Sequence, residues 1–271
     1  MSVLDAIAKQ YENNKSGNST STTSYEQDFS KYFAVRLEDG ANDGEMTIRI
    51  MPPKTGVHPQ IKDTETPFDE GHWHYLKVGG KWRKIYCRKH NDGEECPLCN
   101  VTDELYQSWK DTGNKEDKEL ANQYKAKKFY IARLIDREKE DDGIKFWRFP
   151  HNYKGAGVFD KMIAVFSEKG DISDAKEGRD LIINIGKDDR GNSVVSSIIH
   201  DDREPLGTEE QVAEWISDTM TWEDVFSKRD YDYLSKVARG ENPYEKKETS
   251  SGEVKKNQSD EEEVMDDEQP F

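Results

Sequence analysis

The chain has 271 residues, of which 33 % are hydrophobic and 35 % are charged, and its formal net charge is −16. No apolar run approaches the roughly 20 residues that span a bilayer, and the N-terminus has no apolar signal-peptide segment, so we expect a soluble, intracellular protein with no membrane contact. Only three cysteines are present, close together, which excludes a disulfide-rich secreted scaffold. An acidic chain is also a poor nucleic-acid binder unless its positive charge is concentrated locally.

The N-terminal segment joins a short amphipathic pattern to a polar linker. Apolar residues at positions 3, 4, 7, 8 and 11 predict a helix over residues 3–11. A helix of this length is not stable alone, so it would pack on the chain's own body or on a neighbouring protomer. We therefore treat residues 1–24 as a helix and flexible linker, and residues 25–240 as the folded core.

The core pattern is dominated by strands. Alternating residues predict a hairpin over residues 32–53 and a second over 74–87 that turns at Gly79–Gly80. A helical stretch over 102–128 is interrupted near Gly113. The remaining expected elements are strands 128–137 and 144–150, a helix over 157–168, paired strands 180–188 and 192–200, and helices over 208–218 and 221–240. We predict a mainly β fold with helical additions (α+β), an OB-fold-like small Greek-key barrel.

All three cysteines fall within 13 residues, which is typical of a metal site. Cys96 and Cys99 form a CPLC knuckle, and Cys87 lies nine residues before Cys96. Zinc prefers four tetrahedral ligands, and a site filled by four side chains has no open position for chemistry. Three histidines are candidates for the fourth ligand: His74, His90 and, less favourably placed, His72. The sequence thus predicts one structural Zn²⁺ in a subdomain over about residues 58–125, against the alternative of three free thiols.

Positive charge is concentrated next to this site and is interleaved with aromatic residues. Residues 71–91 hold six bases and no acid, and residues 124–133 and 145–154 repeat the mixture. Cations can follow phosphates while rings stack on unpaired bases, each worth about 1–3 kcal/mol. Alternate strand residues face opposite sides, so roughly half of them would instead be core. The candidate DNA-binding residues in these stretches are Lys81, Trp82, Arg83, Lys84, Arg88, Lys127, Lys128, Phe129, Tyr130, Arg133, Trp147, Arg148, Tyr153 and Lys154.

The C-terminal segment 241–271 is predicted to be a disordered acidic tail. Its residues 257–271 carry seven acids and no base, and the chain ends in Pro270–Phe271. A terminal ring beside an α-carboxylate suits an apolar pocket with a basic rim on a partner protein. The same acids could compete weakly with DNA for the positive surface, and a purely solubilising tail is the alternative. The candidate partner-binding residues are Asp266, Asp267, Glu268, Pro270 and Phe271.

Several stretches together resemble a known family. They are "TIRIMPPK", "HYLKVGGKWRKIYCRKHNDGEECPLC", "KKFYIARL" and "FWRFPHNYKGAGVFDKMIAV". They are similar to the single-stranded DNA-binding, or helix-destabilising, proteins of T-even-like bacteriophages, over roughly residues 32–200. In that family a histidine precedes the first zinc-binding cysteine by thirteen residues, so the resemblance favours His74 over His90. It also implies an OB-fold core with a zinc subdomain beside the DNA cleft, and it places five residues at or near that cleft: Phe129, Tyr130, Trp147, Arg148 and Phe159.

The resemblance further implies a role in phage DNA replication, recombination and repair, in the cytoplasm of an infected bacterial host. The acidic tail would recruit replication and recombination proteins such as a polymerase, a helicase or its loader, and a recombinase. The family's N-terminal arm is basic and makes cooperative contacts, whereas this chain has only Lys9 and Lys15 before Lys31, so we expect only weak self-association on DNA. The terminal Pro-Phe is more similar to the tip of bacterial single-strand-binding proteins.

No motif for catalysis stands above this interpretation. The sequence has no P-loop, GxSxG or HExxH, so we expect a binding protein and not an enzyme. One alternative is a primase or nuclease subunit that carries a zinc ribbon, for which Asp201–Asp202, in a predicted loop, is the best acidic pair for Mg²⁺. A second alternative is an RNA-binding or transcription-associated zinc protein.

Overall fold

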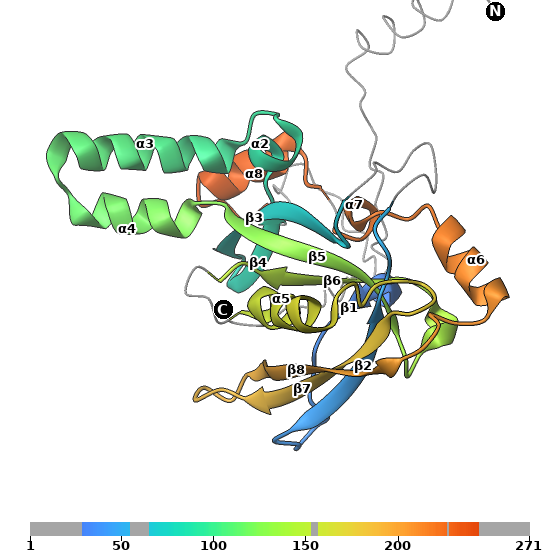
Figure 1. Ribbon diagram of the computed structural model, residues 1–271. Helices are drawn as coiled ribbons and strands as arrows, with labels where there is room; N and C mark the ends of the chain where they lie inside the picture. Colours follow the sequence, from blue (N-terminus) through green and yellow to red (C-terminus); the bar gives the residue numbers. More distant parts are fainter. Residues whose placement is uncertain (1–28, 55–64, 153–156, 227, 244–271) are drawn as a thin grey trace, which may run out of the picture.

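The computed structural model describes residues 29–54, 65–152, 157–226 and 228–243 (Figure 1). The strands are β1 (Tyr32–Phe33), β2 (Gly44–Ile50), β3 (Phe68–Val78), β4 (Lys81–Tyr86), β5 (Lys127–Asp136), β6 (Lys145–Pro150), β7 (Arg179–Lys187) and β8 (Ser193–Arg203). The helices are α2 (Arg88–Asp92), α3 (Pro97–Thr112), α4 (Lys115–Tyr124), α5 (Val158–Lys169), α6 (Glu209–Ser217), α7 (Trp222–Val225) and α8 (Tyr231–Ala238), with 3₁₀ turns η1 (Phe29–Lys31) and η2 (Glu140–Asp142). The fold is α+β, as the sequence predicts.

One mixed sheet runs through the molecule in the order β1-β6-β5-β2-β7-β8, and β3 also pairs with β5 and carries β4 at its other edge. The predicted hairpin over residues 32–53 is wrong. Strand β1 pairs with β6 in parallel, while β2 pairs antiparallel with both β5 and β7. Residues 34–38 form no strand, and the two residues of β1 pair with β6, so the first arm of the expected hairpin does not form beside β2.

The second predicted hairpin is confirmed. Strands β3 and β4 pair antiparallel from Trp73↔Tyr86 to Val78↔Lys81. Gly79 and Gly80 make the turn with φ of 59° and 86°. Both angles lie in the left-handed region, which side chains with a Cβ seldom adopt, so the glycine pair permits this tight two-residue turn.

The sheet separates two apolar cores. The barrel core lies between β2, β5, β6 and β7 and is covered by α5 through Met162 and Val165. The outer core lies on the other face of β3, β5 and β6, where Trp215, Trp222 and Phe226 cover it. Strand β5 is buried on both faces because its even-numbered residues enter the barrel core and its odd-numbered residues enter the outer core. This two-sided burial is compatible with an OB-like barrel that carries additions on one side.

The helices predicted within the described residues form, and one of them is divided in two, whereas the helix predicted over residues 3–11 lies outside the described residues. Helices α3 and α4 make an antiparallel pair that projects from the body, and Gly113 ends α3 with φ of 73° (Figure 1). The predicted helix over 221–240 is two helices, α7 and α8. Helix α8 packs Leu234 and Val237 into a third apolar cluster beside the cysteines. Among the described residues, no helix combines the length and the apolar composition needed to cross a membrane.

A buried ionic network fastens the connection after β8 to the sheet. The fully buried Arg49 lies 3.1 Å from Asp180, and Arg137 contacts the same carboxylate at 2.6 Å. Arg49 also donates to the backbone oxygen of Glu204 at 2.8 Å. Although burial opposes ionisation of the carboxyl, hydrogen bonding to Arg137 and Arg49 lowers the pKa of Asp180. The network therefore keeps all three groups charged inside the fold.

Candidate functional site

Four metal-ligating side chains from three local structures meet at one end of the β3–β4 hairpin. His74 lies on β3 opposite Ile85 of β4, and Cys87 follows β4 by one residue. Because residues two apart on a strand share a face, Cys87 lies on the His74 side of the hairpin. Cys96 is the N-cap of α3 and Cys99 lies in its first turn. The hairpin and the start of α3 thus bring together residues that are up to 25 positions apart in the chain.

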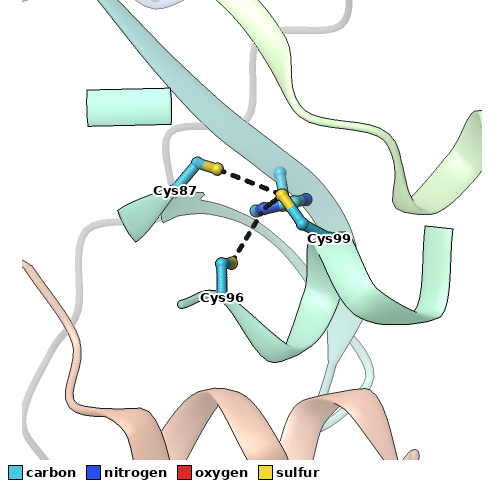
Figure 2. A group of neighbouring side chains, drawn as sticks. Cys87, Cys96 and Cys99 are labelled. Carbon is cyan, nitrogen blue, oxygen red and sulfur yellow. Dashed lines mark hydrogen bonds between the residues drawn. The ribbon is translucent and has the colours of Figure 1, made fainter. Parts of the chain in front are cut away.

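The spacing of the ligand atoms fits a tetrahedral zinc ion. Figure 2 shows the three cysteine side chains converging. The sulfurs of Cys87 and Cys99 are 3.5 Å apart, and Nε2 of His74 lies 3.4 Å from the Cys96 sulfur and 3.7 Å from the Cys99 sulfur. All four ligand atoms lie within 4.8 Å of one another. With Zn–S bonds of about 2.3 Å, tetrahedral geometry puts neighbouring ligand atoms roughly 3.5–3.8 Å apart.

The electrostatics of this cluster also favour a cation. Hydrogen bonding to Cys87 and Cys99 lowers the pKa of the Cys96 thiol, while hydrogen bonding to Cys87 and Cys96 raises the pKa of Cys99. Such opposed changes mean that neighbouring sulfurs cannot all ionise without a compensating positive charge. Cys96 and Cys99 lie at the start of α3, and Cys87 precedes α2, so each lies at a helix N-terminus, where backbone N–H groups favour thiolates. A divalent metal would allow three thiolates to coexist.

The second ring nitrogen of His74, Nδ1, forms a hydrogen bond within the protein. It lies 2.5 Å from the backbone oxygen of Tyr124, the last residue of α4. A proton on Nδ1 donated to that oxygen leaves Nε2 unprotonated and directed at the sulfurs, the form that ligates zinc. His90 is exposed and stacks on His72 with ring centroids 5.1 Å apart, and neither belongs to the four-ligand cluster. Of the three candidate histidines, His74 is the one that completes the cluster.

The β3–β4 hairpin turns one face toward solvent, and this face collects cations and rings. Register pairs Tyr75 with Lys84 and Lys77 with Trp82, and β5 adds Lys127 opposite Trp73. Directly paired residues lie on the same side of a sheet, so these side chains share one surface. We call the set Tyr75, Lys77, Trp82, Lys84 and Lys127 the hairpin face.

Contacts within the hairpin face hold its rings in place. Tyr75 and Trp82 stack with centroids 5.0 Å apart and planes 15° from parallel. The Lys127 ammonium lies 5.8 Å from the centre of the Tyr75 ring, and desolvation lowers the pKa of Lys127. Trp82 remains 47 % exposed. An exposed, rigidly held indole with lysines around it can stack on an unpaired base while the ammonium groups meet its phosphates.

Arg148 continues this face toward the outer core. Strand pairing places it opposite Ile131, on the side of β6 that carries Phe146. Its guanidinium lies 4.9 Å from the centre of the Trp73 ring and 4.4 Å from that of Phe226. The cation is therefore held between rings at the inner end of the hairpin face.

A second aromatic group lies on the opposite side of β5. Tyr130 stacks on Phe159 at 3.7 Å with an angle of 9° between the rings, and Lys128 lies 5.3 Å from the Tyr130 ring centre. Lys128 also pairs with Glu70 at 2.6 Å. Tyr130 is buried and Phe159 is partly buried. This pair is separated from the hairpin face by the thickness of the sheet.

Comparison with known proteins supplies the decisive observation. The family model described as "gp32 DNA binding protein like" matches residues 42–241, which include both strands of the hairpin, all four cluster ligands and both aromatic groups. The chain belongs to this family. A search of curated proteins finds no match to the chain. The gp32-like family is a family of DNA-binding proteins, so binding of single-stranded DNA is the activity that this membership supports.

In this gp32-like protein the predicted DNA-binding residues do not share one surface: some lie on the hairpin face and others lie in the cores or elsewhere on the surface. Trp82, Lys84 and Lys127 come together on the hairpin face. Phe129 is 0 % and Trp147 is 4 % exposed, so both are core residues and a stacking role for them does not fit this conformation. Alternation in the sequence could not separate core from surface residues in these strands, because β5 and β6 have a core on each face.

The other predicted basic residues lie elsewhere. Lys81 and Arg83 pair with Val78 and Leu76, on the side of the hairpin that faces away from the hairpin face. Arg88 forms an ion pair with Glu94, and Arg133 is buried. Tyr153, Lys154 and the five tail residues predicted to bind partners (Asp266, Asp267, Glu268, Pro270, Phe271) lie outside the described residues.

Two members of the hairpin face, Tyr75 and Lys77, lie in the basic and aromatic stretch 71–91 but were not among the candidate DNA-binding residues. The signal for them was present in the Gly79–Gly80 turn. A two-residue turn fixes the register, so it pairs Lys77 with Trp82 and Tyr75 with Lys84 without further information. Asp201 and Asp202 lie within β8 and not in a loop. They lie at an irregularity in the pairing of β7 with β8, and among the described residues neither belongs to a group of three or more side chains that could hold a metal ion.

Proposed function

We propose that this gp32-like protein binds single-stranded DNA without reading its sequence, through the hairpin face. The observation that carries this proposal is the stack of the half-buried Tyr75 on the exposed Trp82 among three lysines, in a chain whose net charge is −16. Stacking accepts any base, and the lysines contact only the backbone, so neither interaction selects a sequence. Arg148 and the Tyr130–Phe159 pair are further candidate contacts at the flanks of this surface.

The zinc ion has a structural role in this proposal. His74 and the three cysteines fill all four positions, so the ion would brace the hairpin against α3 and α4 and leave no site for substrate. Because Tyr75 is adjacent to His74, the brace lies directly behind the DNA-binding surface. We propose a binding protein without catalytic activity. Among the described residues, Asp201 and Asp202 belong to no group of three or more possible metal ligands, which weighs against a nuclease or primase site.

We also propose the cellular role that the phage resemblance implies. The protein would coat exposed single strands during phage DNA replication, recombination and repair, in the cytoplasm of an infected bacterium. Its acidic tail, with Asp266, Asp267, Glu268 and Pro270–Phe271, would recruit a polymerase, a helicase or its loader, and a recombinase. The N-terminal segment 1–24 would contribute at most weak contacts between protomers, because it has few basic residues.

The test compares nucleic acids of equal length. Tryptophan fluorescence is titrated with single-stranded DNA, duplex DNA and single-stranded RNA of mixed sequence at two salt concentrations. We expect the tightest binding for single-stranded DNA, strong quenching that is reduced in Trp82→Leu, and weaker binding at high salt. Equal affinity for the duplex would refute the proposal, and a preference for RNA would support the RNA-binding alternative.

A further inference from the structure

A groove lies at the tip of the β3–β4 hairpin, where the hairpin meets the ends of α4 and α8. It encloses about 1320 Å³. One wall is the hairpin turn with Lys77 and Trp82, and the other is formed by Leu120 and Tyr124 of α4 and by Lys236 and Val237 of α8. We call it the tip groove. A groove of this size can hold more than one nucleotide-sized group.

The side chains of the tip groove combine exposed apolar surface with positive charge. Trp82 is 47 % and Leu120 is 41 % exposed, and they are two of the five large hydrophobic side chains exposed in the described part of the chain. Glu241 at the rim is bound by Arg239 at 2.7 Å, which compensates its charge. Lys77 and Lys236 then remain as cations of the groove. Exposed apolar surface together with net positive charge marks a binding surface for an anionic, partly flat ligand.

The tip groove is continuous with the hairpin face. Lys77 and Trp82 belong to both, because they form a cross-strand pair of the hairpin face, one pair away from the Gly79–Gly80 turn, and they also line the groove. Trp82 has Tyr75 against one side of its ring, and the rest of the indole borders the groove. A DNA strand that lies on the hairpin face and continues past Lys77 and Trp82 would therefore reach the tip groove, where Leu76 and Val78 line the hairpin side.

We propose that the tip groove is a second segment of the path of single-stranded DNA. Nucleotides beyond those on the hairpin face bind there, with a base against Trp82 and Leu120 and with phosphates at Lys77 and Lys236. The inference rests on the proposed function, and it adds that the binding site is longer than the hairpin face and ends between α4 and α8. Short oligonucleotides would occupy the hairpin face alone, and longer ones would reach the groove.

The experiment measures affinity as a function of strand length on the full chain. Fluorescence anisotropy is recorded for labelled oligothymidylates of about 4 and about 16 nucleotides, the range covered by single OB-type binding sites. The test variant is Lys236→Gln combined with Leu120→Glu. The matched control, Lys110→Gln with Ala213→Glu, makes the same changes at exposed positions of α3 and α6. We expect the test variant to bind the long strand roughly tenfold more weakly at 0.1 M salt and the short strand within about twofold of the unaltered chain.

A variant that adds a positive charge to the groove distinguishes the loss of a DNA contact from damage to the fold. Leu120→Lys should raise affinity for the long strand and leave the short strand unchanged, which a destabilised protein would not do. An equal effect on both lengths, or no effect of any groove variant, would overturn the proposal. If the groove binds a protein segment instead of DNA, none of the groove variants should change DNA affinity. If the unaltered chain binds neither strand, the proposed function itself fails, which is a distinct outcome.

Discussion

The lysines of the hairpin face should determine how strongly DNA binding depends on salt. The perturbation is the triple change Lys77→Gln, Lys84→Gln and Lys127→Gln, which removes three charges and keeps most of each side-chain stem. Each phosphate contact on a single strand contributes about 0.7 to the slope of log K against log salt, so the slope should fall by about 2. At 0.1 M salt this corresponds to roughly 100-fold weaker binding, or about 3 kcal/mol.

The assay is a salt titration of affinity for oligothymidylate. The control removes three charges from other exposed lysines, with Lys110→Gln, Lys115→Gln and Lys139→Gln, so that the net charge changes equally. We expect the control to keep the slope of the unaltered chain and the two triple variants to converge toward one affinity near 1 M salt. Equal slopes for test and control at low salt would refute the reasoning, because binding would then respond to net charge and not to this surface.

Three further predictions concern the metal, the tail and the ionic network. Cys96→Ser should abolish stoichiometric zinc and lower the melting temperature by roughly 10 °C or more, and a metal-free protein of full stability would rule the site out. Removal of residues 257–271 should raise affinity for single strands at low salt, because the acids no longer compete with DNA. Deletion of Phe271 alone should abolish partner capture in a pull-down and leave DNA affinity unchanged. Unchanged DNA affinity after the first deletion, or normal partner capture after the second, would contradict the role given to the tail. Asp180→Asn should lower the free energy of unfolding by about 3–5 kcal/mol at pH 7, because it leaves buried guanidinium groups uncompensated. Although burial opposes ionisation, Arg137 lowers the pKa of Asp180. The carboxylate therefore stabilises the fold above about pH 4, and this stabilisation is lost as the pH falls below that value. Denaturation curves should show a smaller difference in free energy of unfolding between the unaltered chain and Asp180→Asn at pH 3 than at pH 7.

Local signals in the sequence were sufficient for most elements of the fold. The Gly79–Gly80 turn and the interruption at Gly113 are both where the pattern places them, because left-handed backbone conformations select glycine. The spacing of the cysteines alone identified three members of the cluster that could hold a metal ion. The fourth followed from the family resemblance, since spacing alone favoured His74 and His90 almost equally and only the pairing of β3 with β4 separates them.

Non-local pairing is what the sequence did not reveal. Residues 32–50 alternate as a hairpin would, but β2 pairs with β5 and β7, which come more than 80 residues later. The same cause hid the environment of Phe129 and Trp147. Their strands are covered by α5 on one side and by residues from α6 and α7 on the other, and no short window records both coverings. For this reason the sequence does not show which aromatic residues of β5 and β6 belong to a core.

The hydrogen bond from His74 to Tyr124 makes histidine more than one of four interchangeable ligands. A thiolate at this position would coordinate zinc, and tetrahedral four-cysteine sites are common. It would have no second atom with which to reach α4. His74→Cys should therefore retain the metal but remove the hydrogen bond that attaches α4 to the hairpin. In a fully zinc-loaded protein, the loss of this attachment would be visible as faster amide exchange along α4.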